Sequence, residues 1–492
     1  MLVNQKIKIA LINPPIASAF ARIECTFPNL PPIVSLPILA CETERRILAA
    51  SMLTPIIRVY DRPQIAKSFI QTVAQADILG LSTWFSNYQS AISIACGAKK
   101  LNPKLKVVLG GPNAANLGAR PLWNRDCIDF VVAGDGEDAM WRLAVGHAPA
   151  TVPNLWYRDS HGHATRTYNA EIDLNTIAPF DFRHVVDLDL SAYDSRQPGY
   201  SYSPATLPVS VAWIRGCPKA VSHGRCGYCS IPDRTLRCMN AENAWAQLRH
   251  LRDEYGINSF FEGGDDFSCR TFAEDLANSK AFVSGIHLRG YSGLWRLTDR
   301  KLEAFRKAGV SELFVGLETA NSTVNKWCGR KLSRQQILHT FSRIHAHGIG
   351  VCMPLLFGLP HESRSSLNQS EALASELIER FDNIRMVLIS IAVPLIGSPW
   401  FSQLVEDHTI RYAYGQHDLT TTDIPDYARL SELSISRFCN ATSAQIAATL
   451  ERLRSTLANK VAIGSFGALD QSDNVHCEIL RDQMEPLNAR AL

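Results

Sequence analysis

Three cysteines, Cys217, Cys226 and Cys229, follow directly after the apolar stretch at residues 208–214. Because that stretch reads as a strand, all three thiols leave its end within one loop. Thiolates that converge in this way bind soft metals, either zinc or an iron–sulfur cluster. A zinc site normally needs a fourth ligand, and no second CxxC pair follows at zinc-ribbon spacing. Three cysteines without an evident fourth fit a four-iron cluster whose last iron is open to a substrate or cofactor.

The eight residues between Cys217 and Cys226 leave two interpretations open. In the first, they are a loop insertion that keeps the ligand geometry and reshapes the rim of the cluster. In the second, His223 within them becomes a fourth ligand and the site holds zinc. Pro218 and Gly224 allow the sharp turns that a loop returning to the same metal needs.

Length and composition set the frame for these residues. A chain of 492 residues is too long for one hydrophobic core and indicates two or three domains. Its net charge of +3 gives no support for a nucleic-acid partner. The thirteen cysteines are scattered rather than arranged as a disulfide framework, which favours a reducing, cytoplasmic protein. No segment reaches the roughly 18 uncharged apolar residues of a membrane span.

Residues 1–150 alternate short apolar runs with amphipathic ones. The predicted strands are 8–13, 55–61, 77–82, 106–111 and 129–134. Near-continuous apolar strands separated by helices indicate a parallel sheet covered on both faces, hence a doubly wound, Rossmann-like α/β domain. Such domains bind ligands beyond the carboxyl ends of their strands. Small or polar turns stand at four of those ends here, at residues 13–15, 82–83, 110–112 and 134–137.

The rest of the chain divides into three parts. Residues 151–205 are polar and turn-rich and are predicted to be a linker with a small hairpin around Gly162. Residues 206–400 alternate strand and helix, with strands predicted at 208–214, 257–263, 282–288, 312–318, 352–358 and 386–393. Six such units predict a partial (β/α)6 barrel, in which Ser333 caps one helix and Gly348 ends it. Residues 401–492 are predicted to be a small, mostly helical cap and tail.

This arrangement resembles the cobalamin-dependent radical S-adenosylmethionine (SAM) enzyme family over roughly residues 5–400. The first part carries it in DILGLS, KVVLGGPN and DFVVAGDGE, and the second in FEGGDDFSC, LFVGLETANSTVNKWCGRK, PLLFGLPHES and AVPLIGSPW, in the expected order. The usual cysteine spacing of the family is CxxxCxxC. The second half, CGYC, fits this spacing, whereas eight residues instead of three separate the first two cysteines.

The resemblance implies a role for particular residues. Cys217, Cys226 and Cys229 would bind three irons of a [4Fe–4S] cluster whose fourth iron chelates SAM. The implied SAM contacts are Tyr228, Gly263, Gly264, Asp265, Glu318 and Gly358. The implied cobalamin contacts are Ser82, Gly110, Gly111, Gly134 and Glu137. The DxHxxG motif that supplies a histidine to cobalt is absent, which is common in this family and also fits a domain that has lost cobalamin.

The activity that the resemblance implies is methylation of an unactivated carbon in a biosynthetic intermediate, through methylcobalamin and a 5′-deoxyadenosyl radical. A non-methylating rearrangement, cyclisation or oxidation with the same cofactors is an alternative, and so is a non-catalytic cobalamin- or metal-binding protein. The implied partners are a small-molecule or peptide substrate and an electron donor such as flavodoxin or ferredoxin. Specific catalytic side chains are not identified by the sequence.

Overall fold

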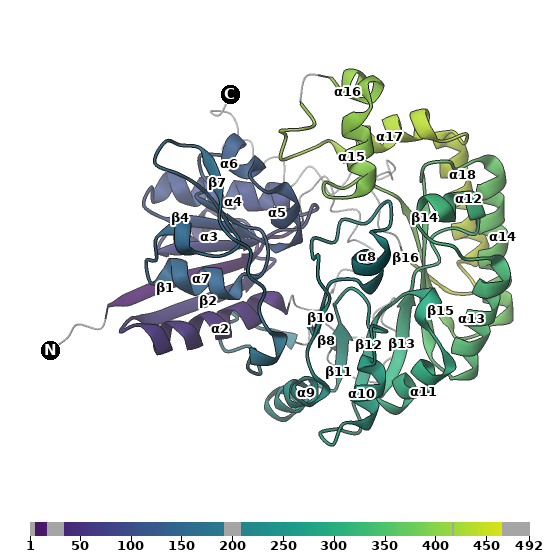
Figure 1. The fold of residues 1–492 in the computed structure, drawn as a ribbon, viewed down its shortest axis with the longest axis horizontal. Coiled ribbons are helices and arrows are strands. Elements are labelled where there is room, and N and C mark those ends of the chain that lie inside the picture. Colours follow the sequence, from purple (N-terminus) through teal and green to yellow (C-terminus); the bar gives the residue numbers. More distant parts are fainter. Residues whose placement is uncertain (1–4, 17–33, 191–207, 416–417, 465–492) are drawn as a thin grey trace.

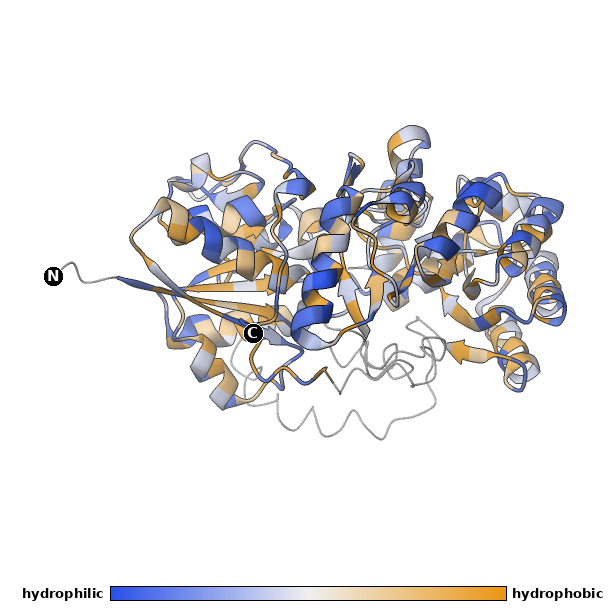
Figure 2. Cartoon of the chain, turned by 90° about the horizontal axis from the view of Figure 1, so that it is seen from below, coloured by the Kyte–Doolittle hydropathy of each residue, from blue (hydrophilic) through white to orange (hydrophobic). Residues whose placement is uncertain are grey.

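The computed structural model describes residues 5–16, 34–190, 208–415 and 418–464. They form two α/β units that lie side by side, each built on a seven-stranded sheet (Figure 1). A two-stranded ribbon of β9 (Ile214–Arg215) and β10 (Arg237–Cys238) accompanies the second sheet. The strands are largely apolar, whereas the covering helices mix apolar and polar residues (Figure 2). This pattern is expected where amphipathic helices cover both faces of a parallel sheet.

The first sheet has the strand order β2-β1-β3-β4-β5-β6-β7, and its first five strands run parallel. These five are β1 (Lys6–Asn13), β2 (Thr54–Asp61), β3 (Ile78–Ser82), β4 (Lys106–Gly110) and β5 (Phe130–Val132). The helices are α2 (Ser35–Ala50), α3 (Lys67–Val73), α4 (Tyr88–Leu101), α5 (Gly111–Leu117), α6 (Arg120–Asn124) and α7 (Glu137–Ala144). The predicted doubly wound fold is confirmed, and in the order 2-1-3-4-5 ligands bind where the strand order reverses, between β1 and β3.

An antiparallel hairpin extends the first sheet. β6 (Leu155–Arg158) pairs with β5 and with β7 (Ala164–Arg166). Gly162 lies in the turn with a φ of +80°, a conformation that suits a residue without a Cβ. The predicted hairpin therefore exists, and it belongs to the first sheet rather than to a free linker.

The second sheet has the order β16-β15-β14-β13-β12-β11-β8, with every neighbouring pair parallel. Its strands are β8 (Pro208–Val211), β11 (Ser259–Glu262), β12 (His287–Ser292), β13 (Val310–Val315), β14 (Gly350–Phe357), β15 (Ile384–Ile391) and β16 (Ala462–Gly464). Its helices are α9 (Ala241–Tyr255), α10 (Phe272–Asn278), α11 (Asp299–Lys307), α12 (Ser322–Trp327), α13 (Arg334–Ala346) and α14 (Arg364–Arg380). The six predicted strands thus form an open parallel sheet in chain order, as a partial barrel requires.

Two details of this sheet differ from the prediction. The third strand lies at 287–292 rather than 282–288, because Gly285 has a φ of +75° and turns the chain before the strand begins. The strand β16 was not predicted, since three residues are too few to show an alternating pattern. It adds a seventh strand beside β15.

The start and end of α13 follow the predicted signals. Ser333 accepts a hydrogen bond from the Gln336 N–H, and the Gln336 side chain accepts one from the Ser333 N–H, which completes a capping box. Gly348 follows the helix with a φ of +65°. Phe341 and Ile344 are buried on one face of the helix, facing the sheet.

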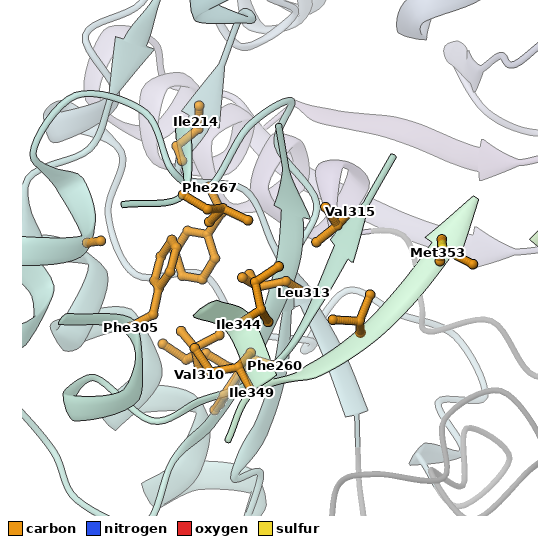
Figure 3. Close-up of a cluster of buried hydrophobic side chains, with 14 of the residues drawn as sticks. Ile214, Phe260, Phe267, Phe305, Val310, Leu313, Val315, Ile344, Ile349 and Met353 are labelled. Carbon is orange, nitrogen blue, oxygen red and sulfur yellow. The ribbon is translucent and has the colours of Figure 1, made fainter. Parts of the chain in front are cut away.

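The largest hydrophobic core lies between the second sheet and its helices (Figure 3). Phe260, Phe267, Phe305 and Leu313 are fully buried there. Burial of each such side chain stabilises the fold by about 1.5–3 kcal/mol. The strand ends, where the sequence predicts the candidate site, are therefore supported by a well-packed core.

The described residues of the C-terminal part form four helices instead of the one that is clear in the sequence. They are α15 (Pro399–Glu406), α16 (His408–Tyr414), α17 (Tyr427–Phe438) and α18 (Ser443–Leu457). Trp400, Leu404 and Leu430 belong to the same apolar cluster as Ile92 and Leu122 of the first unit. The C-terminal helices thus complete a core that the first unit begins.

Polar contacts strengthen this junction. The Tyr88 hydroxyl donates to Asp423 over 2.9 Å, and the Arg125 guanidinium donates to both oxygens of the same carboxylate. Asp423 is buried, so its charge depends on Arg125 for compensation.

One disulfide joins Cys96 of α4 to Cys127 ahead of β5, with their Cα atoms 5.0 Å apart. The sequence predicts no disulfide framework, and this single pair is not one. In the part of the chain that the structure describes, no helix combines the length and the apolar character needed to cross a membrane.

Candidate cofactor site

The three cysteines lie in one loop that leaves β9. Cys217 precedes the short helix α8 (Pro218–His223), in which Pro218 occupies the first turn. Gly224 ends this helix with a φ of +79° and returns the chain toward Cys226. The eight-residue insertion is therefore an ordered helix between the first and second thiols.

The thiols share one partly buried neighbourhood. Burial raises the pKa of Cys217 and raises that of Cys229 to about 12, and the charges of Cys226 and Cys217 add to the effect on Cys229. Among the described residues, no three His, Cys, Asp or Glu side chains are grouped closely enough to hold a metal ion. The thiols therefore have to turn toward one another when a metal binds. Their number and their common loop fit an iron–sulfur cluster, whose binding would displace the thiol protons.

His223, the alternative fourth ligand, lies at the end of α8 and is exposed. Its Nδ1 is 2.6 Å from the hydroxyl of Ser222. The structure thus gives His223 a local partner on its own helix.

The residues Gly263, Gly264 and Asp265 follow β11 directly and reach the base of the cysteine loop. The Gly216 N–H, one residue before Cys217, donates to the Asp265 carboxylate over 2.8 Å. Burial, together with the charge of the nearby Asp233, raises the pKa of Asp265 to about 7. Asp265 therefore fixes the backbone from which the first thiol leaves.

Gly264 is where the turn after β11 packs most tightly. A Cβ at this position would lie 2.5 Å from the carbonyl oxygen of Ile214 and 2.7 Å from the Glu262 carboxylate. Glu262 is fully buried, which raises its pKa to about 8, and it accepts a hydrogen bond from the Trp213 N–H. Its second oxygen has no hydrogen-bond partner among the described residues, and such an orphaned buried acceptor marks a place where a ligand donor fits.

Tyr228 and Glu318, which are far apart in the sequence, meet beside the thiols. The Tyr228 hydroxyl donates to Glu318 over 3.1 Å, and the Arg330 guanidinium donates to the same oxygen over 3.1 Å. Burial raises the pKa of Glu318, while Arg330 opposes the rise. Arg330 also interacts with Cys226 and lies 5.8 Å from the Tyr228 ring centre and 5.4 Å from that of Trp295.

The backbone at Glu318 is unusual. Its φ is +63°, a left-handed conformation that side-chain-bearing residues rarely adopt. A parallel bridge to Leu355 of β14 holds it there, because Glu318 donates to the Pro354 carbonyl and accepts from Leu356. Strained residues of this kind occur where the surrounding structure imposes a functional orientation.

Gly358 follows β14 and turns the chain with a φ of +82°. Its N–H donates to the buried Glu362 carboxylate over 2.7 Å. A Cβ at Gly358 would face Ile435 of α17 at 3.3 Å. Gly358 therefore shapes the junction with the C-terminal helices, and no contact with the thiols is seen for it.

The first sheet also presents its predicted residues at strand ends. Ser82 of β3 and Gly110 of β4 are register partners, so they stand side by side. Gly111 has a φ of +88°, and a Cβ there would lie 2.7 Å from the Thr83 backbone nitrogen. A Cβ at Gly110, in contrast, would meet nothing within 4 Å. Gly110 thus leaves open space beside the switch between β1 and β3 for close approach of a large ligand.

Gly134 and Glu137 follow β5. Their contacts differ from those of Ser82, Gly110 and Gly111. Gly134 packs against Asn154, whose side chain would lie 2.9 Å from an added Cβ. Glu137 is buried and accepts from Arg215, two residues before Cys217, over 2.5 Å. In this structure Glu137 therefore contacts the second unit.

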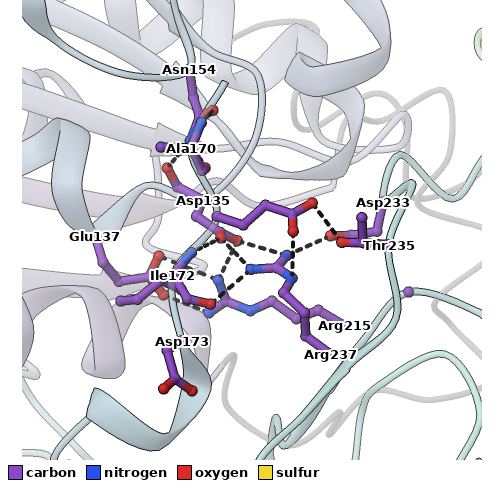
Figure 4. Close-up of polar contacts among 12 residues, drawn as sticks. Asp135, Glu137, Asn154, Ala170, Ile172, Asp173, Arg215, Asp233, Thr235 and Arg237 are labelled. Atoms are coloured by element: carbon purple, nitrogen blue, oxygen red, sulfur yellow. Dashed lines mark hydrogen bonds and ion pairs between the residues drawn. The ribbon is translucent and has the colours of Figure 1, made fainter. Parts of the chain in front are cut away.

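An ion network surrounds that contact (Figure 4). Arg215 also donates to Asp135 over 2.5 Å, and Arg237 binds both Asp135 and Asp233. Burial would raise the pKa of Asp135, but the two guanidinium groups hold it below its ordinary value. Two carboxylates of the first unit thus bind two arginines of the second, a set we call the ion cage: Asp135, Glu137, Arg215 and Arg237.

Further hydrogen bonds hold the cysteine loop from outside. The Asn116 side chain, from α5 of the first unit, donates to the carbonyl of Ser230 over 2.7 Å, next to Cys229. The backbone N–H of Trp400 donates to the Gly227 carbonyl over 2.9 Å. The loop is therefore held by both the first unit and the C-terminal helices.

Comparisons with known proteins relate this chain to a known superfamily. The sequence model of the Radical SAM superfamily matches residues 211–374, which include all three cysteines. An uncharacterized methyltransferase of Pyrococcus horikoshii is 24% identical over 408 residues, covering 80% of this chain and 82% of the relative.

Two solved structures share the whole architecture. The radical SAM methyltransferase TsrM of Kitasatospora setae, with cobalamin and a [4Fe–4S] cluster bound, has a TM-score of 0.68 at 14% identity and covers 94% of this chain and 93% of its own. The cobalamin-dependent SAM radical enzyme OxsB, with aqua-cobalamin bound, has a TM-score of 0.67 at 14% identity, covering 92% and 67%.

Residues 211–374 therefore form a radical SAM domain, and the chain has the fold seen in TsrM and OxsB. The cofactors of the superfamily are a [4Fe–4S] cluster and SAM.

Several residues at this site were missed by the sequence analysis. Arg330 and Glu262 lie inside the quoted segments LFVGLETANSTVNKWCGRK and FEGGDDFSC, and Arg215 lies two residues before Cys217, but none of the three was singled out, because the role of each depends on a partner elsewhere in the chain. A charged residue inside a segment that otherwise reads as core, such as Glu262 at the end of an apolar strand, is the one signal that could have indicated them.

Proposed function

We propose that this protein is a cobalamin-dependent radical SAM methyltransferase that methylates an unactivated carbon of a biosynthetic intermediate. The observation that carries the proposal is the contact between the two units. Asp135 and Glu137, at the carboxyl end of β5, bind Arg215, at the base of the cysteine loop. Asn116, near the end of the helix α5 that follows β4, holds the other end of that loop. The ligand-binding edge of the first sheet thus adjoins the proposed cluster.

Each cofactor has residues that suit it. Cys217, Cys226 and Cys229 would hold the cluster, and the Arg330 guanidinium group lies beside Cys226. The orphaned oxygen of Glu262 and the buried pair of Tyr228 and Glu318 would orient SAM. Bound to these sites, SAM on the cluster would supply hydrogen-abstracting chemistry and cobalamin would carry the methyl group.

The first sheet would hold cobalamin along Ser82, Gly110 and Gly111, where the open space at Gly110 lies. Gly134 would contribute its backbone to that edge. Glu137 would hold the edge against the second unit through the ion cage. The likeness of the fold to TsrM and OxsB and the methyltransferase name of the Pyrococcus relative support this assignment.

The test of methyl transfer uses SAM labelled in its methyl group. The protein is reconstituted anaerobically with iron, sulfide and cobalamin, reduced, and supplied with candidate substrates. Formation of 5′-deoxyadenosine together with labelled product supports the proposal. Turnover that leaves the product unlabelled would show a non-methylating rearrangement, cyclisation or oxidation instead, and absence of SAM cleavage would favour a carrier.

Cobalamin binding has its own test at Gly110. A Gly110→Val variant fills the open space without meeting protein atoms within 4 Å of its Cβ. We expect it to keep the thermal stability of the wild type and to lose bound cobalamin, measured by visible absorbance after gel filtration. Retention of cobalamin by this variant would place the cofactor elsewhere.

A further inference from the structure

A pocket of about 340 Å³ opens beside the cysteine loop, between α8 and the residues that follow β12. Its wall includes Lys219 and His223 of α8 together with Trp295, Arg296 and Lys301. No carboxylate lines it, so this pocket is strongly cationic. The eight-residue insertion between Cys217 and Cys226 supplies one side of it.

The two lysines of this pocket lack anionic partners among the described residues. Lys219 is only 8% exposed, and its ammonium group donates to the carbonyl of Gly224 over 2.9 Å. Lys301 donates to the carbonyl of Ser268. Within the described residues, neither lysine forms an ion pair. A buried ammonium group that is solvated only by a carbonyl is costly, and an anion in the pocket would offset that cost.

Arg296 adds to the positive charge. Its nearest carboxylate, Asp266, lies 3.5 Å away, and its Nε is buried without a hydrogen-bond partner. Burial lowers the pKa of Lys301, and the charge of Arg296 lowers it further, so the two cations repel each other across the pocket. Both effects favour a bound anion that contacts them together.

Trp295 connects the pocket to the proposed SAM site. Its ring is 40% exposed and lies 5.4 Å from the Arg330 guanidinium, which binds Glu318. One layer of side chains therefore separates the cationic pocket from Tyr228 and Glu318. The exposed indole offers a flat apolar surface next to the cations.

We propose that this pocket binds the carboxylate or phosphoryl group of the methyl acceptor, whose flat or apolar part lies on Trp295. This inference rests on the proposed function for the identity of the ligand, while the anion site itself stands on the geometry. A concave pocket of this size suits an anionic group of a small molecule better than it suits the surface of an acidic protein. The α8 insertion would then be a substrate-recognition element.

Anion binding is tested on the whole protein, without turnover. Equilibrium dialysis with radiolabelled inorganic phosphate and, separately, with radiolabelled acetate measures whether either class of anion binds saturably and which is preferred. We expect one to bind, with affinity that falls as chloride is added. Lys301→Gln and Lys219→Gln should each weaken binding about tenfold or more, because each removes a hydrogen bond to a charged group. Lys104→Gln, at an exposed lysine of the first unit, should bind as the wild type does.

Because Lys219 also holds the Gly224 carbonyl, thermal melts of each variant must match the wild type before its affinity is interpreted. Lys301→Arg, which keeps the charge, should restore most of the binding lost in Lys301→Gln. The proposal is overturned if neither anion binds saturably, or if the folded glutamine variants bind as the wild type does. It is also overturned if methionine or SAM displaces the anion, since the pocket would then belong to SAM. Anion binding without any methyl transfer would instead disprove the proposed function alone.

Discussion

Arg330 shows how a single side chain connects the parts of the candidate site. Its guanidinium group binds Glu318, lies over the ring of Tyr228, and reaches Cys226. Tyr228 and Glu318 could be singled out from the sequence because each stands in a recognisable motif. Arg330 stands in the same segment as Glu318, but its role could not be predicted, since that role depends on a loop that brings it back to the end of β13, and no periodicity encodes that return.

The first prediction concerns the metal ligands. Cys226→Ala should abolish assembly of the cluster, because only two thiolates would remain in the loop. His223→Ala should spare it, since His223 is exposed and contacts Ser222. Iron and sulfide analysis with visible absorbance after anaerobic reconstitution provides the measurement. Loss of metal from His223→Ala, with zinc in the wild type, would establish the four-ligand zinc site instead.

A second prediction concerns Glu362. Burial raises its pKa to about 8, against an ordinary 4.5, and a hydrogen bond from Gly358 only partly opposes the rise. The folded state therefore keeps a proton that the unfolded state loses, so the stability that the protonated group contributes is full below about pH 4.5 and is lost as pH rises through about 8.

Glu362→Gln removes this titration. We expect the variant to match the wild type at pH 5 and to exceed it by roughly 2–5 kcal/mol at pH 9, seen as a higher melting temperature. Glu303→Gln, at an exposed position, is the control and should show no such difference. A gap between Glu362→Gln and the wild type that stays constant with pH would contradict the prediction.

At the scale of elements, the strands were more predictable than their exact ends. All five parallel strands of the first sheet and six of the seven strands of the second were recognised, because buried parallel strands are continuous apolar runs. The third barrel strand begins at residue 287 rather than at the predicted residue 282. The apolar residues before Gly285 have the composition of a strand but form a loop. The three-residue β16 has no pattern to recognise, and its place depends on the edge of β15.

The turn after β11 gives a prediction at this scale. Gly264→Ala should destabilise the junction of β11 with β9, because its Cβ would lie 2.5 Å from the Ile214 carbonyl oxygen. Gly263→Ala is the matched control, where the nearest atom, the Val211 carbonyl oxygen, is 3.6 Å away. We expect a lower melting temperature and less bound iron for Gly264→Ala alone. If the two variants have the same melting temperature and the same iron content, the turn accommodates the added Cβ without loss of stability.

At the scale of the whole molecule, the ion cage is the feature that no sequence pattern indicated. Its carboxylates stand in a turn expected to contact cobalamin, and its arginines flank the cysteine loop. The carboxylates lie in the first unit and the arginines in the second, so these ion pairs exist only where the two units meet.

Arg215→Gln should therefore loosen the two units from one another. Removing one partner of a buried ion pair leaves uncompensated charge and costs about 3–5 kcal/mol. We expect faster proteolysis at the junction of the units and a lower melting temperature, whereas Arg249→Gln, outside the cage, should change neither. If Arg215→Gln leaves both measurements unchanged, the cage does not hold the units together.

The apolar cluster shared by the first unit and the C-terminal helices bears on how the chain is made. Ile92 and Leu122 emerge from the ribosome long before Trp400 and Leu430, which cover them in the finished protein. Throughout synthesis, the first unit has its strands and helices but not the residues that close this face. The first unit is therefore translated long before its own core can be completed, and a chaperone that shields apolar surface during translation would act on it.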